Sequence, residues 1–233
     1  MATTLVLWDI DHTLIETRGI GGQVYAEAFR QVTGRTLEKM PELAGRTEPV
    51  IFREALKING IEPSENLYDR FAAEQAQGYA AHLDELRTRG RALPGAANAL
   101  LELAKRDDLI QSVLTGNTRP SAEIKLRAFD LYRYLDFDIG AYGTDDDTRA
   151  NLVDMARQRA EKAHGLSFDG NATVLIGDTP NDVTAARDSG ARIIAVATGK
   201  DSAAVLAEAG APTVLADLTD TPAVLAAIYG QPE

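Results

Sequence analysis

Short apolar runs without alternation recur along the chain, and they constrain its fold more than any other feature. Several are apolar at consecutive positions, as expected of strands buried on both faces of a sheet. Helix-like segments lie between them, such as Pro94–Lys105 and Asn151–His164. This repeated order predicts an α/β fold with a parallel sheet covered on both faces. The runs are Leu5–Trp8, Ser112–Leu114, Phe137–Ala141, Thr173–Ile176, Arg192–Val196 and Thr213–Leu215.

One stretch, from about Gly19 to Arg89, interrupts the alternation and shows only helical periods, including a long one from Leu67 to Leu86. The strand pattern resumes after Leu93–Gly95, where proline can open the next helix. We therefore expect two domains. Residues 1–17 and 91–233 form a Rossmann-like, three-layer α/β core, and residues 18–90 form a small all-helical insert after the first strand.

Composition excludes several kinds of partner and site. The 233 residues carry a formal charge of −11, which argues against a nucleic-acid partner because phosphate backbones recruit basic surfaces. The absence of cysteine excludes disulfides and thiolate metal sites. The N-terminus lacks the basic segment and length of a signal peptide, and no apolar stretch reaches the ~20 residues of a membrane span. We expect a soluble, cytoplasmic protein without a membrane partner, either a monomer or a homodimer.

Acidic side chains follow the first apolar run. Asp9 and Asp11 are two residues apart at the end of a predicted strand, so they point the same way. Two carboxylates that close resist joint ionisation, so the pair needs a cation or a shared proton. A polar turn after a strand is the alternative reading of this pair alone.

Two later strands also end in polar residues. The run at Val174 leads into Gly177, Asp178 and Asp182, and Thr179 or Asp178 could cap a helix that begins at Pro180. A cap accounts for one of these acids but not for both. The run at Val113 leads into Thr115–Asn117, a hydroxyl, an open backbone and an amide that could cradle phosphate oxygens. By itself this segment reads equally well as a turn.

Together the three strand ends resemble the motifs of the haloacid dehalogenase-like superfamily of phosphatases. Its members carry hhhhDxDxT (h, apolar), then an apolar strand ending in Thr or Ser, then a Lys or Arg, then hhhhGDxxxD. Here Leu5–Thr13, Val113–Asn117 and Val174–Asp182 match the first, second and last motifs, in the family's order and over nearly the whole chain. The helical insert resembles the small C1-type cap of phosphoglycolate-phosphatase-like members.

The resemblance implies a Mg²⁺-dependent hydrolysis of a small phosphorylated metabolite, a phosphomonoester. Asp9 would be the nucleophile that forms an aspartyl-phosphate. Asp11 would be the general acid that protonates the leaving oxygen and then the base that activates water. The metal ligands would be the Asp9 carboxylate, the Asp11 backbone carbonyl and Asp178, an oxygen-only set that suits Mg²⁺.

The resemblance also assigns residues that would bind the phosphoryl group. Thr115, Gly116 and Asn117 would hold its oxygens, and Thr13 would support the first loop beside them. Asp182 would orient the basic residue or a metal-bound water.

That basic residue has two candidates. Arg149 opens the helix before the last motif, where close relatives place their lysine, and it is the favoured one. Its fork can bridge a carboxylate and a phosphoryl oxygen. Lys125, in the helix after Thr115, is the alternative.

Two further residues bear on substrate binding. His12 stands where relatives usually have glycine, and we interpret it as a structural residue and not as a second acid–base. Arg46 lies between two insert helices, at a position where related proteins contact substrate, and it could bind a carboxylate or a second phosphate. An arginine at a helix start could also be only a solvated side chain, and a lone histidine could be only a packing or capping residue.

Other functions stay open at this point. A phosphotransferase or mutase of the same family, similar to β-phosphoglucomutase, would pass the phosphoryl group to a hydroxyl instead of water. A non-catalytic binding protein on this fold would have lost catalytic acids, and all four are present here. A haloacid dehalogenase would usually lack a carboxylate at the position of Asp11. A response-regulator receiver would be shorter and would lack the insert.

Overall fold

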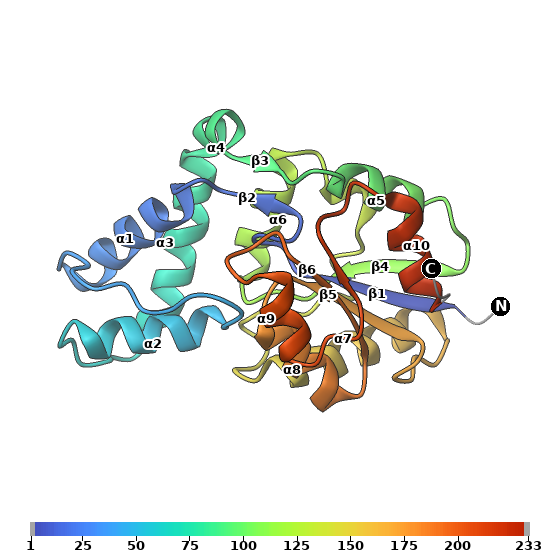
Figure 1. The fold of residues 1–233 in the computed structure, drawn as a ribbon. Helices are drawn as coiled ribbons and strands as arrows, with labels where there is room; N and C mark the ends of the chain where they lie inside the picture. The colour runs from blue at the N-terminus through green and yellow to red at the C-terminus, as the bar shows by residue number, and fades with distance from the viewer. Residues whose placement is uncertain (1–2, 231–233) are drawn as a thin grey trace.

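The computed structural model describes residues 3–230 and consists of an α/β core with a helical cap beside it (Figure 1). The core sheet has five parallel strands in the order β4-β1-β5-β6-β7. Its strands are β1 (Thr4–Trp8), β4 (Leu109–Val113), β5 (Thr173–Gly177), β6 (Arg192–Val196) and β7 (Val214–Leu215). The predicted α/β fold with a helical insert after the first strand is confirmed.

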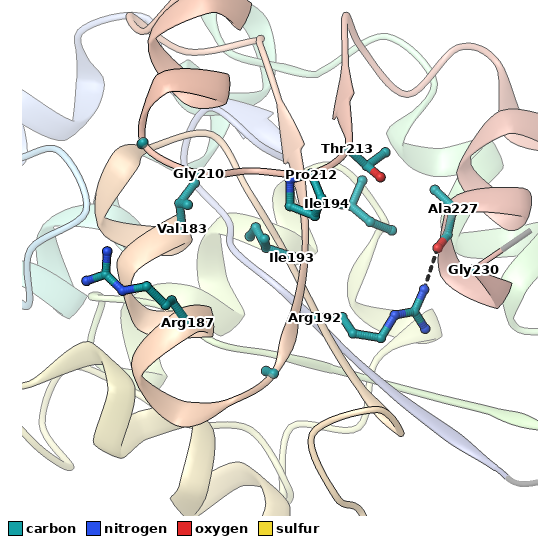
Figure 2. A pocket seen from close by; sticks show the side chains of 12 residues that line it. Val183, Arg187, Arg192, Ile193, Ile194, Gly210, Pro212, Thr213, Ala227 and Gly230 are labelled. Carbon is teal, nitrogen blue, oxygen red and sulfur yellow. Dashed lines mark hydrogen bonds between the residues drawn. The ribbon is translucent and has the colours of Figure 1, made fainter. Parts of the chain in front are cut away.

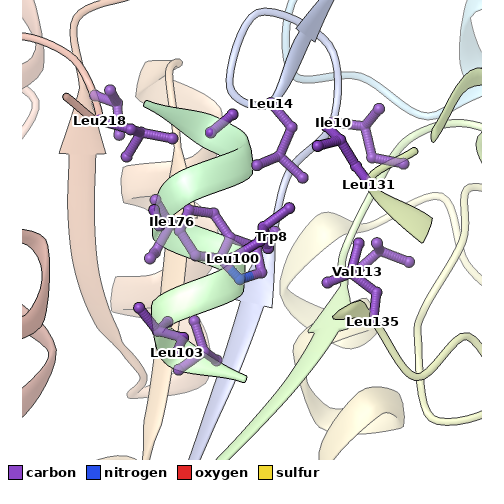
Figure 3. Close-up of a cluster of buried hydrophobic side chains, with 14 of the residues drawn as sticks. Trp8, Ile10, Leu14, Leu100, Leu103, Val113, Leu131, Leu135, Ile176 and Leu218 are labelled. Carbon is purple, nitrogen blue, oxygen red and sulfur yellow. The ribbon is translucent and has the colours of Figure 1, made fainter. Parts of the chain in front are cut away.

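Two layers of helices cover the sheet. Because β1 side chains alternate between faces, Val6 and Trp8 join one apolar cluster while Leu5 and Leu7 join another. Figure 3 shows the first cluster, in which Trp8 and Ile176 of the sheet lie against Leu100. Both clusters are fully apolar, as the non-alternating runs predict. The first face is covered by α5 (Ala96–Leu103), α6 (Arg119–Ala128) and α10 (Thr221–Tyr229), and the second by α7 (Arg149–His164), α8 (Pro180–Ser189) and α9 (Ala203–Glu208).

The cap has its own apolar core, built around aromatic rings. Phe71 stacks on Phe52 with ring centroids 4.3 Å apart, and Tyr25 meets Phe71 edge-on at 4.8 Å. The long helical period from Leu67 to Leu86 is broken at His82, whose backbone (φ −94°, ψ 17°) leaves the helical region. The cap helices are α1 (Ile20–Thr33), α2 (Glu48–Ile58), α3 (Leu67–Ala81) and α4 (Leu83–Arg89).

The chain enters and leaves the cap through one small ribbon. Here β2 (Ile15–Glu16) pairs antiparallel with β3 (Arg91–Ala92), and Arg91 Nε donates to Glu16 Oε2 at 2.9 Å. Directly after β2, Arg18 and Gly19 both have positive φ, 47° and 91°, so the chain bends sharply before α1. The domain boundaries predicted at residues 18 and 90 lie between these two strands.

The strand predicted at Phe137–Ala141 is wrong. This segment follows a 3₁₀ turn, η1 (Tyr132–Tyr134), and only an isolated bridge joins Ala141 to Leu114. The Asp136 side chain accepts from the Asp138 backbone N–H at 2.9 Å, a local bond that competes with sheet pairing. Among residues 3–230, no helix combines the length and the apolar character that crossing a membrane requires.

Candidate active site

The polar strand ends meet at the carboxyl edge of the sheet. Asp9 directly follows β1 and Asp178 directly follows β5, while Thr115 comes two residues after β4. Since β1 lies between β4 and β5, this edge is the point where the strand order reverses, the usual place for a ligand in such sheets. The cap lies over the edge and encloses a cavity of about 210 Å³. Its core lining includes Asp9, Asp11, His12, Thr115, Gly116, Asn117, Lys125, Arg149 and Asp178.

A carboxylate cluster of Asp9, Asp178 and Asp182 lies at the base of this cavity. Oxygens of the three side chains are within 4.8 Å of one another, and all three residues are buried. Burial raises the pKa of Asp9 and of Asp178, and repulsion within the cluster raises both further, although Arg149 opposes the effect. The cluster is therefore short of positive charge, and its oxygen donors fit a divalent cation such as Mg²⁺.

Arg149, the first residue of α7, joins two members of the cluster. Its Nη2 donates to Asp9 Oδ1 at 2.7 Å and its Nε donates to Asp182 Oδ1 at 2.8 Å. The other Asp182 oxygen accepts from the backbone and the hydroxyl of Thr179, which closes a capping box at the start of α8. The predicted Thr179 cap is confirmed. Because these bonds occupy both oxygens of Asp182, Asp9 and Asp178 are the members best placed to bind a cation.

Asp178 is fixed from two sides. The hydroxyl of Thr13 donates to Asp178 Oδ1 at 3.1 Å, so buried Thr13 supports this carboxylate and does not line the cavity. On the other side, a Cβ at Gly199 would lie 1.9 Å from Asp178 Oδ2. A side chain at residue 199 would therefore displace the Asp178 carboxylate, a contact that the sequence analysis missed.

Asp11 stands apart from the cluster and has different partners. Lys125 Nζ donates to both its carboxylate oxygens, at 2.8 and 3.0 Å, and Asn117 Nδ2 donates to Oδ2 at 2.8 Å. Burial alone would raise the pKa of Asp11, but the Lys125 charge and these hydrogen bonds outweigh it and hold the pKa below its usual value. The two basic candidates are thus separated in space, Arg149 on Asp9 and Lys125 on Asp11.

The loop after β4 presents one free donor to the cavity. Thr115 Oγ1 accepts from the Asn117 backbone at 3.2 Å and from Asn117 Nδ2 at 2.7 Å, which leaves its own proton for a ligand. The Asn117 amide oxygen accepts from Lys125 at 2.6 Å, so this side chain organises the site more than it faces the cavity. Gly116 receives the cap, since its carbonyl accepts from the Glu48 backbone at 2.8 Å.

Arg46 and His12 lie at the mouth of the cavity. Arg46 is half-buried, and its Nη1 donates to the Glu42 carbonyl at 3.3 Å. His12 is exposed and has a φ of 64°, a left-handed conformation that glycine adopts at lower cost than histidine. The His12 carbonyl accepts from the Thr198 hydroxyl at 2.6 Å.

Buried cap residues also line the cavity, and the sequence analysis assigned no site role to three of them that carry polar groups. We call Tyr25, Glu48 and Gln75 the cap wall. A signal for Gln75 exists in the sequence, because Phe71, Gln75 and Tyr79 are spaced by four and place one polar residue on an apolar helix stripe. Glu48 follows a loop and opens a helix, where an acid is ordinarily read as a favourable end charge.

A second hollow, of about 510 Å³, lies elsewhere on the core, between α8, β6 and α10 (Figure 2). Arg192, at the first position of β6, donates there to the carbonyls of Ala227 and Ile228. This hollow begins at the amino edge of the sheet, and none of the predicted site residues lines it. The chemistry is therefore assigned to the cavity under the cap.

Several solved structures share this fold. The chain is similar to a hydrolase from Pseudomonas syringae, with 22% identity over 97% of this chain and 99% of that one and a TM-score of 0.70. It is also similar to a predicted phosphoglycolate phosphatase from Haemophilus somnus (18% identity, 96% and 98% coverage, TM-score 0.68). CbbY from Rhodobacter sphaeroides, solved in complex with phosphate, gives 18% identity, 94% and 96% coverage and a TM-score of 0.68.

No curated protein sequence matches the chain at a significant level. The model of the haloacid dehalogenase-like hydrolase family matches residues 6–187, a range that includes every member of the carboxylate cluster together with Asp11, Thr115 and Arg149. The chain belongs to the haloacid dehalogenase-like hydrolase family.

Proposed function

We propose that the protein is a Mg²⁺-dependent phosphatase that hydrolyses a small phosphomonoester through an aspartyl-phosphate on Asp9. One observation carries this proposal. The two carboxylates of the first motif have opposite surroundings, Asp9 within a buried acidic cluster and Asp11 under a lysine and an amide. Such a separation suits two roles, a nucleophile beside a cation and an acid–base beside the leaving group.

Asp9 is the group that attacks phosphorus. The Arg149 bond engages its Oδ1 and orients the carboxylate, while Oδ2 stays available. Attack forms the bond from this oxygen to phosphorus, and the bond from phosphorus to the leaving oxygen breaks. Arg149 also bears a charge that offsets the phosphoryl oxygens, and Asp182 keeps the guanidinium in place.

The donor set under the cap fits Mg²⁺, held by the Asp9 and Asp178 carboxylates with the Asp11 backbone carbonyl as a third ligand. When bound, the ion supplies positive charge that offsets the repulsion between Asp9 and a dianionic ester. Thr13 and Gly199 keep Asp178 in position for this role.

Asp11 handles protons in both steps. It protonates the leaving oxygen as the ester bond breaks, and afterwards it takes a proton from the water that cleaves the aspartyl-phosphate. Its contact with Lys125 favours the ionised form, which is the form needed for the second step. In the first step Asp11 acts as the acid, so it must carry a proton and turn from Lys125 toward the substrate.

Four residues complete the proposal for substrate binding. The Thr115 hydroxyl donates to a phosphoryl oxygen, and the backbone of Gly116 and Asn117 shapes the adjoining wall. Arg46, at the mouth of the cavity, meets the phosphorylated ligand as it enters.

The test is release of free phosphate from a panel of small phosphate esters, with and without Mg²⁺, by the wild type and by Asp9→Asn. The substitution removes the nucleophile and nearly preserves the shape. We expect a loss on the order of 10³-fold or more, roughly 4 kcal/mol of transition-state stabilisation.

Asp145→Asn is the matched control, because Asp145 pairs with Arg159 away from the cavity. It should retain wild-type turnover. Activity that survives in Asp9→Asn, or that ignores Mg²⁺, would contradict the proposal. Transfer of phosphate to an added alcohol without release of free phosphate would instead support a phosphotransferase.

A further inference from the structure

The cap wall faces the carboxylate cluster across the cavity, and its three side chains come from three different cap helices. Tyr25 lies on α1, Glu48 on α2 and Gln75 on α3. They are only 3%, 7% and 2% exposed, yet all three line the same cavity as Asp9 and Asp11. Since Asp9 and Asp11 approach the phosphoryl group from the core, the cap wall is the surface that the leaving group meets.

Glu48 brings a buried carboxyl group to this wall. Its Oε1 accepts from Gln75 Nε2 at 2.9 Å, and Gln75 in turn accepts from Ser121 of the core at 3.4 Å. Within residues 3–230, no lysine or arginine lies at ion-pair distance from Glu48. Lys125 also lines the cavity and acts on Glu48 at longer range, but its Nζ is hydrogen-bonded to Asp11 and Asn117. At the mouth, Arg46 is half-buried and Lys200 is exposed.

Tyr25 brings a hydroxyl that lacks a partner. Its ring packs edge-on against Phe71, but its oxygen is buried and has no hydrogen-bond partner within the described part of the chain. Buried polar atoms are almost always hydrogen-bonded, so a buried hydroxyl beside a cavity indicates a partner supplied by a ligand. Tyrosine can donate this bond, and Glu48 can only accept one while it is ionised.

A donor and an acceptor that line one cavity match a group that can both accept and donate, such as a hydroxyl. We infer that Glu48 and Tyr25 form a subsite for the hydroxyl groups of a neutral leaving alcohol, and that Glu48 selects against leaving groups with a carboxylate or a second phosphate. This inference rests on the proposed phosphatase function. A hydroxyl can donate to Glu48 and accept from Tyr25 at once, whereas an anion would lie beside a buried carboxylate that has no basic side chain at ion-pair distance among the described residues. The 210 Å³ cavity suits the phosphate of a short polyol better than a nucleotide.

The experiment compares two esters that differ only at one carbon. Glycerol 3-phosphate ends in a hydroxymethyl group, and 3-phosphoglycerate has a carboxylate there. Dissociation constants are measured on Asp9→Asn protein with Mg²⁺, and kcat/KM on the wild type. Binding does not depend on turnover, so it tests the subsite even where hydrolysis fails.

We expect glycerol 3-phosphate to bind at least about tenfold more tightly than 3-phosphoglycerate, a factor that corresponds to ~1.4 kcal/mol. Glu48→Gln keeps the shape and removes the charge, so it should bring the two constants to within about threefold of each other. Tyr25→Phe should weaken glycerol 3-phosphate about fivefold and leave propyl phosphate, which has no hydroxyl, unchanged.

Tyr68→Phe is the matched control, because the Tyr68 hydroxyl is also buried and unpartnered in the described residues but does not line the cavity. It should leave all the ratios at their wild-type values, whereas a merely structural role for these tyrosines would make both variants alike. Equal binding of the two esters, or a ratio that Glu48→Gln does not change, would overturn the subsite. If the wild type shows no turnover that depends on Asp9, but the ratio of the two dissociation constants persists, only the proposed phosphatase function would be overturned.

Discussion

We call the carboxyl edge of the core sheet, with Asp9 and Asp178, the core edge. The core edge and the cap wall both bury polar side chains at the same cavity, but the hydrogen-bond partners of these side chains differ. At the core edge each carboxylate has partners from the chain itself, such as Arg149 for Asp9 and Thr13 for Asp178. At the cap wall, the Tyr25 hydroxyl has no partner in the described residues, and Glu48 has one neutral side-chain partner. The carboxylates of the core are thus held in place by the fold, while the Tyr25 hydroxyl of the cap wall is left for a partner that a ligand would supply.

The largest effect should come from removing the charge at the core edge. Arg149→Met leaves Asp9 and Asp182 buried without their cation, so we expect the free energy of unfolding to fall by about 3–5 kcal/mol. Urea unfolding with and without Mg²⁺ measures this. The ion should stabilise the variant more than the wild type, because it replaces part of the lost charge.

Lys125→Met is the control for that experiment. It also removes a cation, but its partner Asp11 has a side chain 37% exposed and can be solvated. We expect a smaller loss, with no added stabilisation by Mg²⁺. Equal responses of the two variants to Mg²⁺ would show that the core edge does not distinguish the two carboxylates.

The next prediction tests whether the cap unfolds independently of the core. Phe71→Ala removes a fully buried ring from the aromatic cluster, and we expect it to cost the cap about 3–5 kcal/mol. Hydrogen exchange should accelerate at the amides of α1 to α3, while amides of β1 and β5 stay protected. A uniform loss of protection would mean that cap and core unfold as one unit.

A smaller effect should follow from adding one methyl group at Gly116, where the cap meets the core. A Cβ at Gly116 would lie 2.1 Å from the Arg46 carbonyl of the cap, so Gly116→Ala should push the cap loop away. We expect kcat/KM to fall on the order of 10²-fold, as for a small displacement at a reacting site.

Gly170→Ala provides the matched clash, since its Cβ would lie 2.1 Å from the Gly190 carbonyl, within the core. It should lower stability and leave kcat/KM of the folded protein nearly unchanged. If both variants lose activity in proportion to stability, the cap contact at Gly116 has no specific role.

The smallest effect is a pH dependence within the cap. His82 bonds Glu27 at 3.0 Å and Glu85 at 3.1 Å, and these contacts, Glu27 first, raise its pKa despite some desolvation. The raised pKa means that the contacts stabilise the fold below the ordinary value of about 6.5, and that this contribution is lost as the pH rises through the raised value. The Glu27 side chain is 45% exposed, so we expect only a few tenths of a kcal/mol.

Thermal unfolding of the wild type and of His82→Gln, at pH 6 and pH 8, checks the sign. The wild type should lose slightly more stability than the variant on going to pH 8. A larger loss in His82→Gln would reverse the assignment.

The core edge could be predicted from the sequence because strand ends converge by topology. Asp9, Thr115 and Asp178 each follow a short apolar run, and parallel strands bring such positions to one edge whatever the details of packing. The strand prediction failed at Phe137–Ala141 because a local hydrogen bond forms there. The Asp136 side chain accepts from the Asp138 backbone N–H and closes a turn.

The cap wall could not be predicted in the same way. Tyr25 and Glu48 lie on helices whose relative placement depends on how the Phe52 and Phe71 rings stack, and a helical period gives no such information. Gly199 is similar, since its close approach to Asp178 exists only after β6 has paired with β5.

The β2–β3 ribbon makes the cap an exchangeable cassette. Both crossings between the domains lie side by side, tied by the Ile15–Ala92 pairing and the bond from Arg91 to Glu16. A helical segment of different origin can therefore be spliced between Glu16 and Arg91 without re-routing any strand of the five-stranded sheet. Such a graft would keep Asp9, Asp11 and Asp178 on the core and replace the side chains of the cap wall, and it would have to reproduce the contact of the cap with Gly116.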